Sequence, residues 1–383
     1  MQIPFARPLL GTEERQAVLD VMDSGVLVHG PRLHAFEEAF AGFTGAPHCV
    51  AVSSCTAALH LTWFHLGIGP GDEVIVPAQT HAATAHAVEL TGATPVFVDA
   101  EPHTGNIDVG RIGAAVTPRT RALCVVHFLG MPAEMDGVME IARRHGLFVV
   151  EDCALSPGAS IGETHTGLIG DVGCFSFYPA KHMTTAEGGA LITRHEEVAR
   201  AARRQRAFGM DRSFAERTTA GIYDVPELGF NYRMSEVQAA IGVEQVRRLP
   251  DFLRCRAENH AALTEALAGM DGIRLFDPAP DGVRASLYCL SVVLDDALAE
   301  RRPEILERMK EQGVGTSVYY PAPVPHLTYY REKYGYGEDT FPIAARISRN
   351  SIALPVGPHL EPGEMRTIAA VLRDALARAG GAG

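Results

Sequence analysis

Short apolar strands alternate with segments of helix length through the first half of this 383-residue chain. The predicted strands lie over 48–53, 73–77, 95–99, 122–127, 147–152 and 172–178, and the predicted helices over 12–23, 31–44, 56–66, 82–91, 108–115 and 134–145. Strands that are apolar throughout are typical of a mostly parallel sheet covered by helices on both faces. The sequence therefore predicts the α/β class, in which ligands bind beyond the carboxyl ends of the strands.

A long helical tract over 235–269, interrupted near Pro250, follows this region. The segments beyond it that predict a second, smaller α/β unit are a strand over 285–294, a helix over 303–312 and a last helix from 361. We therefore expect a large domain over 1–250, with the N-terminal helical segment included, and a small C-terminal domain over 251–383.

Composition excludes several classes of protein. A formal net charge of −12 argues against nucleic acid or an anionic membrane as a partner. Seven scattered cysteines without a CxxC pair or zinc-like spacing predict free thiols, a reducing compartment and no metal site. No apolar run approaches the roughly 18 residues of a membrane span, so we expect a soluble cytoplasmic protein.

Lys181 lies just after the predicted strand 172–178, behind a turn at Pro179 and Ala180. A charged side chain at the end of a core strand is costly to desolvate unless it is neutralised, paired or used covalently. One such use is a Schiff base with pyridoxal phosphate (PLP). A lysine on a surface loop is the alternative for a lone lysine.

Asp152 closes another apolar strand, where its carboxylate needs a cation or several hydrogen-bond donors. The pyridinium nitrogen of PLP is one such cation, and a cap on the following segment is equally consistent with the position. Its place about thirty residues before the strand-end lysine favours the cofactor.

A polar turn, Ser54-Cys55-Thr56, joins a strand to a helix and so directs free N–H groups and hydroxyls to one point beyond the sheet. This pattern predicts an anion site, although an ordinary helix N-cap would use the same residues. Ser176, in the lysine strand, is a further phosphate candidate, or else a core serine bonded to backbone.

The remaining candidates are aromatic or imidazole side chains. His81 follows a strand and could stack on a pyridine ring, although a lone histidine is more often structural. The candidates for substrate contacts are Tyr178 and His182 beside the lysine, and Tyr319, Tyr320 and His326, which could equally belong to an aromatic core.

Taken together these segments resemble the DegT-type sugar aminotransferases, PLP enzymes of fold type I, over nearly the whole chain. The matching stretches read SFYPAKHMTTAEGG, VVEDCA, VSSCTAALHL and GFNYRMSEVQAAIG. The resemblance implies that Lys181 forms the Schiff base and moves protons, and that Asp152 binds the pyridinium. It also implies that the turn with Ser54, Cys55 and Thr56 binds phosphate, and that Asn231 reaches the phosphate of a neighbouring subunit in a homodimer.

Three departures from that family stand out. Leu155 occupies a position that is often glutamine or histidine, His81 stands where an aromatic ring is common, and Cys55 replaces the usual glycine of the phosphate turn. The lysine segment is also similar to that of the sugar 3-dehydratases, in which a histidine replaces the lysine. Lys181 therefore favours transamination.

The expected function is transfer of an amino group from glutamate or glutamine to the keto group of a nucleotide-linked sugar or of a cyclitol. The setting would be aminosugar biosynthesis, for an antibiotic or a polysaccharide, with PLP and its amino form (PMP) as cofactor. The alternatives are a PLP-dependent sugar dehydratase or eliminase, and a non-catalytic sensor descendant. For the phosphates of a nucleotide sugar, the candidate cations are Arg32, Arg212 and Lys333.

Overall fold

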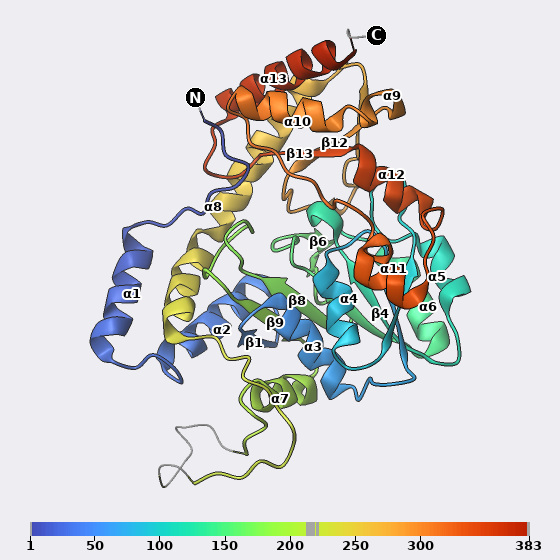
Figure 1. Ribbon diagram of the computed structural model, residues 1–383. Coiled ribbons are helices and arrows are strands. Elements are labelled where there is room, and N and C mark those ends of the chain that lie inside the picture. The colour runs from blue at the N-terminus through green and yellow to red at the C-terminus, as the bar shows by residue number, and fades with distance from the viewer. Residues whose placement is uncertain (1, 212–218, 220–221, 381–383) are drawn as a thin grey trace.

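The computed structural model describes residues 2–211, 219 and 222–380, so the candidate Arg212 lies outside the described residues. A seven-stranded sheet forms its centre (Figure 1). Its strands, in spatial order, are β1 (His48–Val52), β9 (Gly189–Thr193), β8 (Val172–Ser176), β5 (Phe148–Asp152), β4 (Thr120–Val126), β2 (Glu73–Pro77) and β3 (Thr94–Val98). Only the pairs β1–β9 and β9–β8 are antiparallel, which confirms the predicted mostly parallel sheet.

Helices cover both faces of this sheet because side chains alternate along each strand. Val50 and Val52 pack into the core that holds α3 (Cys55–His65), α4 (Ala82–Glu89) and α7 (Glu196–Gln205). Cys49 and Ala51 pack on the opposite face. The helices of that face are α2 (Pro31–Thr44), α5 (Val109–Ala115), α6 (Met135–His145) and the first half of α8 (Glu236–Leu267).

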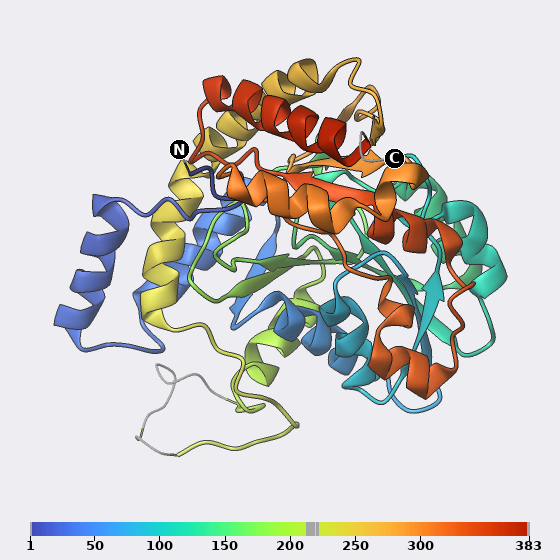
Figure 2. The ribbon, with the colours of Figure 1, turned by 45° about the horizontal axis from the view of Figure 1, so that its top comes forward.

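The second unit is a three-stranded sheet in the order β10 (Ile273–Leu275), β12 (Leu290–Leu294) and β13 (Ser351–Leu354). Its core includes side chains of α8, α10 (Arg302–Glu311) and α13 (Pro362–Gly380), which lie together at one end of the molecule (Figures 1 and 2). β12 starts five residues later than predicted, so Tyr288 lies outside the strand.

The shorter elements are β6 (Ser160–Ile161), β7 (Thr164–His165), β11 (Val283–Arg284), η1 (Phe128–Gly130), α9 (Asp296–Ala299), η3 (Val324–His326), α11 (Thr328–Tyr334) and α12 (Pro342–Asn350).

Helix α8 joins the two units, and the predicted interruption at Pro250 is wrong. The helix runs unbroken through the proline, packed against α1 (Thr12–Ser24) and α2 in its first half and against α13 in its second. Tertiary packing along its whole length outweighs the local cost of the missing N–H.

The two hydrophobic cores cross the expected domain boundary at 250. Ile3 belongs to the core of the small unit and pairs with Val314, whereas Tyr330 and Ile347 belong to the large core. The boundary itself stays a prediction. All seven cysteines are free thiols, and within the described residues no helix has the length and apolarity to span a membrane.

Candidate active site

Lys181 lies in a loop that leaves the carboxyl end of β8. Its backbone N–H donates to the carbonyl of Tyr178 at 2.8 Å, and Thr184 Oγ1 donates to the carbonyl of Phe177 at 3.0 Å. The amine lies 5.5 Å from the centroid of the Tyr288 ring, and no described residue hydrogen-bonds to it. Burial lowers the pKa of Lys181, while the charge of Asp152 raises it in part.

Asp152 is the last residue of β5 and is 5 % exposed. Its Oδ2 accepts a hydrogen bond from Thr84 Oγ1 at 2.8 Å, and its Oδ1 accepts from the backbone N–H of Ala154 at 3.1 Å and from the Cys55 thiol at 3.8 Å. These donors stabilise an ionised carboxylate at the strand end. Cys55, one of the departures from the family pattern, therefore contacts Asp152, and burial first, then the charge of this carboxylate, raise the pKa of its thiol.

The predicted anion turn lies at the N-terminus of α3. Ser54 is the N-cap of this helix, and its Oγ accepts the N–H of Ala57 at 3.1 Å. At Ser54 the side chain therefore makes the helix-capping bond that the sequence also allowed. Strand β9 passes directly against this turn at Gly189, where a Cβ would lie 2.3 Å from the Ser54 carbonyl carbon and 2.5 Å from the Cys55 nitrogen. The close approach requires glycine and fixes the helix N-terminus beside the lysine strand.

The other cofactor candidates surround this turn or lie on the next strand end. Ser176 ends β8 opposite Gly189. His81 is the N-cap of α4, its Nδ1 accepts the N–H of Ala83 at 3.1 Å, and its ring lies edge-on to that of Tyr320 at 5.8 Å. Asn231 is exposed, one residue before Tyr232, whose carbonyl accepts the N–H of Ser53 next to the turn.

The substrate candidates divide into two groups. Tyr319 lies near the lysine, since its hydroxyl bonds to that of Tyr288 at 2.7 Å, and the adjacent ring of Tyr320 contacts His81. Tyr178 is exposed, whereas His326 bonds to Thr340 Oγ1 at 3.1 Å, in a loop of the second half of the chain.

His182 is 2 % exposed, and its Nε2 donates to the carbonyl of Ser286 at 2.9 Å. Its contacts are thus structural, unlike those expected of a residue at a substrate mouth. Leu155 is 2 % exposed within the main core, so its side chain makes only apolar contacts, while its carbonyl accepts the Ser286 hydroxyl at 2.8 Å.

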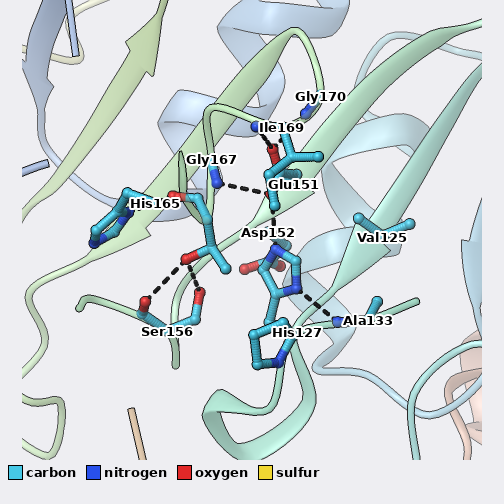
Figure 3. Close-up of polar contacts among 12 residues, drawn as sticks. Val125, His127, Ala133, Glu151, Asp152, Ser156, His165, Gly167, Ile169 and Gly170 are labelled. Atoms are coloured by element: carbon cyan, nitrogen blue, oxygen red, sulfur yellow. Dashed lines mark hydrogen bonds and ion pairs between the residues drawn. The ribbon is translucent and has the colours of Figure 1, made fainter. Parts of the chain in front are cut away.

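A buried carboxylate next to Asp152 braces the strand ends (Figure 3). Glu151 is fully buried and accepts N–H groups from Gly167, Ile169 and Gly170 and from His127 Nε2, at 2.7–2.9 Å. His127 Nδ1 accepts the N–H of Ala133, which fixes the neutral tautomer with its proton on Nε2. Cys153 lies close enough for the three side chains to hold a metal, but four N–H donors already occupy the carboxylate oxygens.

These groups fit PLP on the structure's own terms. Lys181 offers an amine without a hydrogen-bond partner among the described residues, and its lowered pKa favours the reactive neutral form. Asp152 offers a buried carboxylate for a ring nitrogen. The α3 N-terminus offers N–H groups and hydroxyls for a phosphate, and a side chain at Gly189 would collide with the backbone of this turn.

Comparison with known proteins decides the family. Residues 8–373 match the model of the DegT/DnrJ/EryC1/StrS aminotransferase family. The chain belongs to this family. It is similar to the spore coat polysaccharide biosynthesis protein SpsC of Bacillus subtilis, with 39 % identity over 97 % of this chain and 96 % of SpsC.

Solved structures agree. The aminotransferase TlmJ from Streptoalloteichus hindustanus is 34 % identical, with a TM-score of 0.90 over 99 % of this chain and 100 % of TlmJ. Spr1654 from Streptococcus pneumoniae, solved in its PLP form, is 26 % identical, with a TM-score of 0.92 over 99 % of this chain and 100 % of that one. The predicted family, fold, cofactor and enzyme class, a PLP-dependent sugar aminotransferase, are confirmed.

Sequence reasoning missed two residues of the site. Thr84 lies three residues after His81 in the first turn of a helix that follows a strand, so the rule that selected His81 also covers it. Tyr288 faces Lys181 from more than a hundred residues away, and no local pattern around it indicated this.

Proposed function

We propose that this aminotransferase moves an amino group from glutamate or glutamine to the keto group of a nucleotide-linked sugar or a cyclitol. The observation that supports it is the meeting of Lys181 and Asp152, from two strand ends, beside the α3 N-terminus, where the charge of Asp152 acts on the amine of Lys181. When bound, PLP supplies an aldehyde that captures amines and a ring that withdraws electrons from the carbon next to the nitrogen.

The chain's own residues then have separate roles. Lys181 would hold the cofactor covalently, be released by the donor amine, and take a proton from the donor's α-carbon. In the second half of the reaction Lys181 would return a proton to the carbon that carries the new amino group. Asp152, held by Thr84 and Ala154, would keep the ring nitrogen protonated. Ser54, Thr56 and Ser176 would bind the phosphate.

The acceptor needs a partner for its phosphates if it is nucleotide-linked. Arg32 and Lys333 already pair with Asp20 and Glu89, respectively, at exposed positions, so neither is a free cation for this role. Tyr319 and Tyr320 remain our candidates for contacts to the sugar or cyclitol. The similarity to SpsC supports a place in polysaccharide biosynthesis rather than in antibiotic biosynthesis.

We also propose a cytoplasmic homodimer with the active site at the subunit interface. Asn231 is exposed although the segment around it is bonded to the phosphate turn. Large apolar side chains are exposed nearby in the chain at Ile222, Val225 and Leu228, and near α1 at Leu27 and Val28. Sedimentation at micromolar concentration tests this proposal, and a monomer would contradict it.

Absorbance of the purified protein tests the function. Glutamate or glutamine should shift the band of the lysine-bound cofactor to shorter wavelength, and Lys181→Ala should abolish turnover. Lys310→Ala is the matched control, because Lys310 is exposed and forms an ion pair with Glu307 on the surface. Full activity of Lys181→Ala would contradict the assignment of Lys181.

The elimination alternative predicts a bound cofactor that neither donor changes. The sensor alternative predicts no bound cofactor at all.

A further inference from the structure

A cavity of about 420 Å³ lies between the second half of α8 and the large unit. Its wall includes Phe128 and Leu129 of η1, His260 and Thr264 of α8, and residues of β10 and β12. The volume falls within the roughly 300–1,000 Å³ of pockets that hold small molecules. None of the residues assigned above to the cofactor or the substrates is among its described lining residues, so this cavity is separate from the active site.

The wall of the cavity is mostly apolar. Its larger side chains are Phe128, Leu129, Leu275, Phe276 and Leu287, and the rings of Phe128 and Phe276 meet edge-on with their centroids 5.8 Å apart. An ordered water needs about two to four polar partners, and an apolar wall supplies few of them. The space therefore suits the carbon surface of a ligand better than a cluster of waters.

The cavity offers no positive charge. Asp277 is the only charged side chain of the described lining, and it is exposed and pairs with His103 at 3.8 Å. Burial lowers the pKa of His260 to about 4, so this ring is neutral at pH 7. Because PLP and a nucleotide-linked sugar both carry phosphate, which requires cations or several N–H donors, neither fits this wall. The cavity therefore favours a neutral molecule.

Two polar side chains of α8 interrupt the apolar wall. His260 and Thr264 lie one helical turn apart, with Nδ1 of the histidine 3.4 Å from Oγ1 of the threonine. The other ring nitrogen of His260, Nε2, has no hydrogen-bond partner among the described residues. A few polar groups in an apolar pocket fix the orientation of a ligand. This nitrogen is therefore available for one hydrogen bond to a hydroxyl or carbonyl group.

One wall of the cavity separates it from Lys181. Leu287 and Cys289 line the cavity, whereas the ring of Tyr288 between them lies 5.5 Å from the lysine amine. Leu129 and Leu287 both have a left-handed backbone, with φ of 53° and 52°, and the Tyr288 N–H donates to the Leu129 carbonyl at 3.1 Å. Strained backbone of this kind clusters at binding sites and persists only where the surrounding structure holds it. Its presence at two lining residues favours a binding site over an incidental gap.

We propose that this cavity binds a neutral, mostly apolar molecule of one or two rings that carries a single hydrogen-bonding group. The rings would pack against Phe128 and Leu129, and the polar group would bond to His260. The ligand would lie behind Tyr288, close to Lys181 but without competing with the amino donor. The inference goes beyond the proposed function and does not depend on which ketone the enzyme aminates.

Equilibrium dialysis of the PLP-loaded protein with 1-naphthol and with 1-naphthalenesulfonate tests the proposal, because the two probes share a ring system and differ in charge. Naphthol should bind once per chain, and the sulfonate about tenfold or more weakly because no cation lines the cavity. Thr264→Phe places a ring in the cavity and should weaken naphthol binding by about tenfold or more. Ala261→Phe is the matched control, since Ala261 is exposed on the same helix outside the cavity. His260→Phe should weaken naphthol binding by about 2- to 12-fold, the range for loss of one neutral hydrogen bond.

Ala285→Phe keeps the test decisive if Thr264→Phe does not fold, because Ala285 lines the same cavity from a loop. Absence of naphthol binding to wild type, or equal affinity in wild type and the folded cavity-filling variants, would overturn the inference. Sulfonate binding as tight as that of naphthol would overturn the neutral class of ligand. Competition between naphthol and glutamate, followed by cofactor absorbance, would place the probe in the active site and also overturn it. If neither glutamate nor glutamine changes that absorbance, the proposed function fails, while the dialysis still decides this inference.

Discussion

Replacing Glu151 by glutamine should destabilise the protein strongly although the side chain keeps its shape. Each carboxylate oxygen accepts two N–H groups, Oε2 from His127 and Gly167 and Oε1 from Ile169 and Gly170. Glutamine replaces one oxygen by an NH₂ group, which would then face two donors (Figure 3).

The size of the effect follows from these bonds. A hydrogen bond to a charged group contributes about 1.5–3 kcal/mol and a neutral one about 0.5–1.5 kcal/mol, so the two bonds that glutamine keeps are weakened by about 2 kcal/mol together. Two donors left without an acceptor cost about 1–3 kcal/mol each, and the cheaper burial of an uncharged amide offsets part of the total. We expect a net loss of about 3–5 kcal/mol, a large share of the roughly 5–15 kcal/mol of a folded protein.

Urea unfolding of the protein without cofactor measures this loss, followed by the fluorescence of Trp63, the only tryptophan, which is fully buried on α3. Glu101→Gln is the matched control. Glu101 also accepts backbone N–H groups, from His103 and Thr104, but is half-buried, so its loss should stay below about 1 kcal/mol. A Glu151→Gln variant within 1 kcal/mol of wild type would refute the view that this carboxylate braces the strand ends.

Two further perturbations probe other parts of the molecule. Gly189→Ala places a Cβ against the backbone of Ser54 and Cys55, so PLP affinity in an absorbance titration should fall at least tenfold and stability by about 1–3 kcal/mol. Gly113→Ala is the control, because the space around Gly113 is open, and it should change neither quantity. Equal PLP affinity in both variants would contradict a role of this turn in binding the cofactor. Burial lowers the pKa of His165 to about 4. Because the unfolded chain binds that proton near the ordinary value of about 6.5, this histidine's contribution to stability is complete above that pH and is lost towards pH 4. The free energies of unfolding from urea titrations at pH 7.5 and 5.5 should therefore differ by about 1.4 kcal/mol less in His165→Gln than in wild type, and an unchanged difference would refute the assignment.

Local pattern was sufficient to predict much of this fold. Apolar strands and helix-length segments between them predicted the parallel part of the sheet, since burial on both faces leaves few other arrangements. The antiparallel strand β9, which no pattern indicated, closes the sheet between β1 and β8. The predicted break at Pro250 was wrong, because packing against three other helices stabilises the helix through the proline.

The sequence by itself determined the chemistry, because a lysine and an aspartate at the ends of buried strands must come to the same edge of a parallel sheet. It also determined the anion turn, since a polar strand-to-helix junction exposes backbone N–H groups wherever the helix lies. Only the tertiary structure decided the partners of these groups. Thr84 on Asp152 and Tyr288 over Lys181 come from segments that are distant in the sequence, and only the packing of the folded chain brings them to the site.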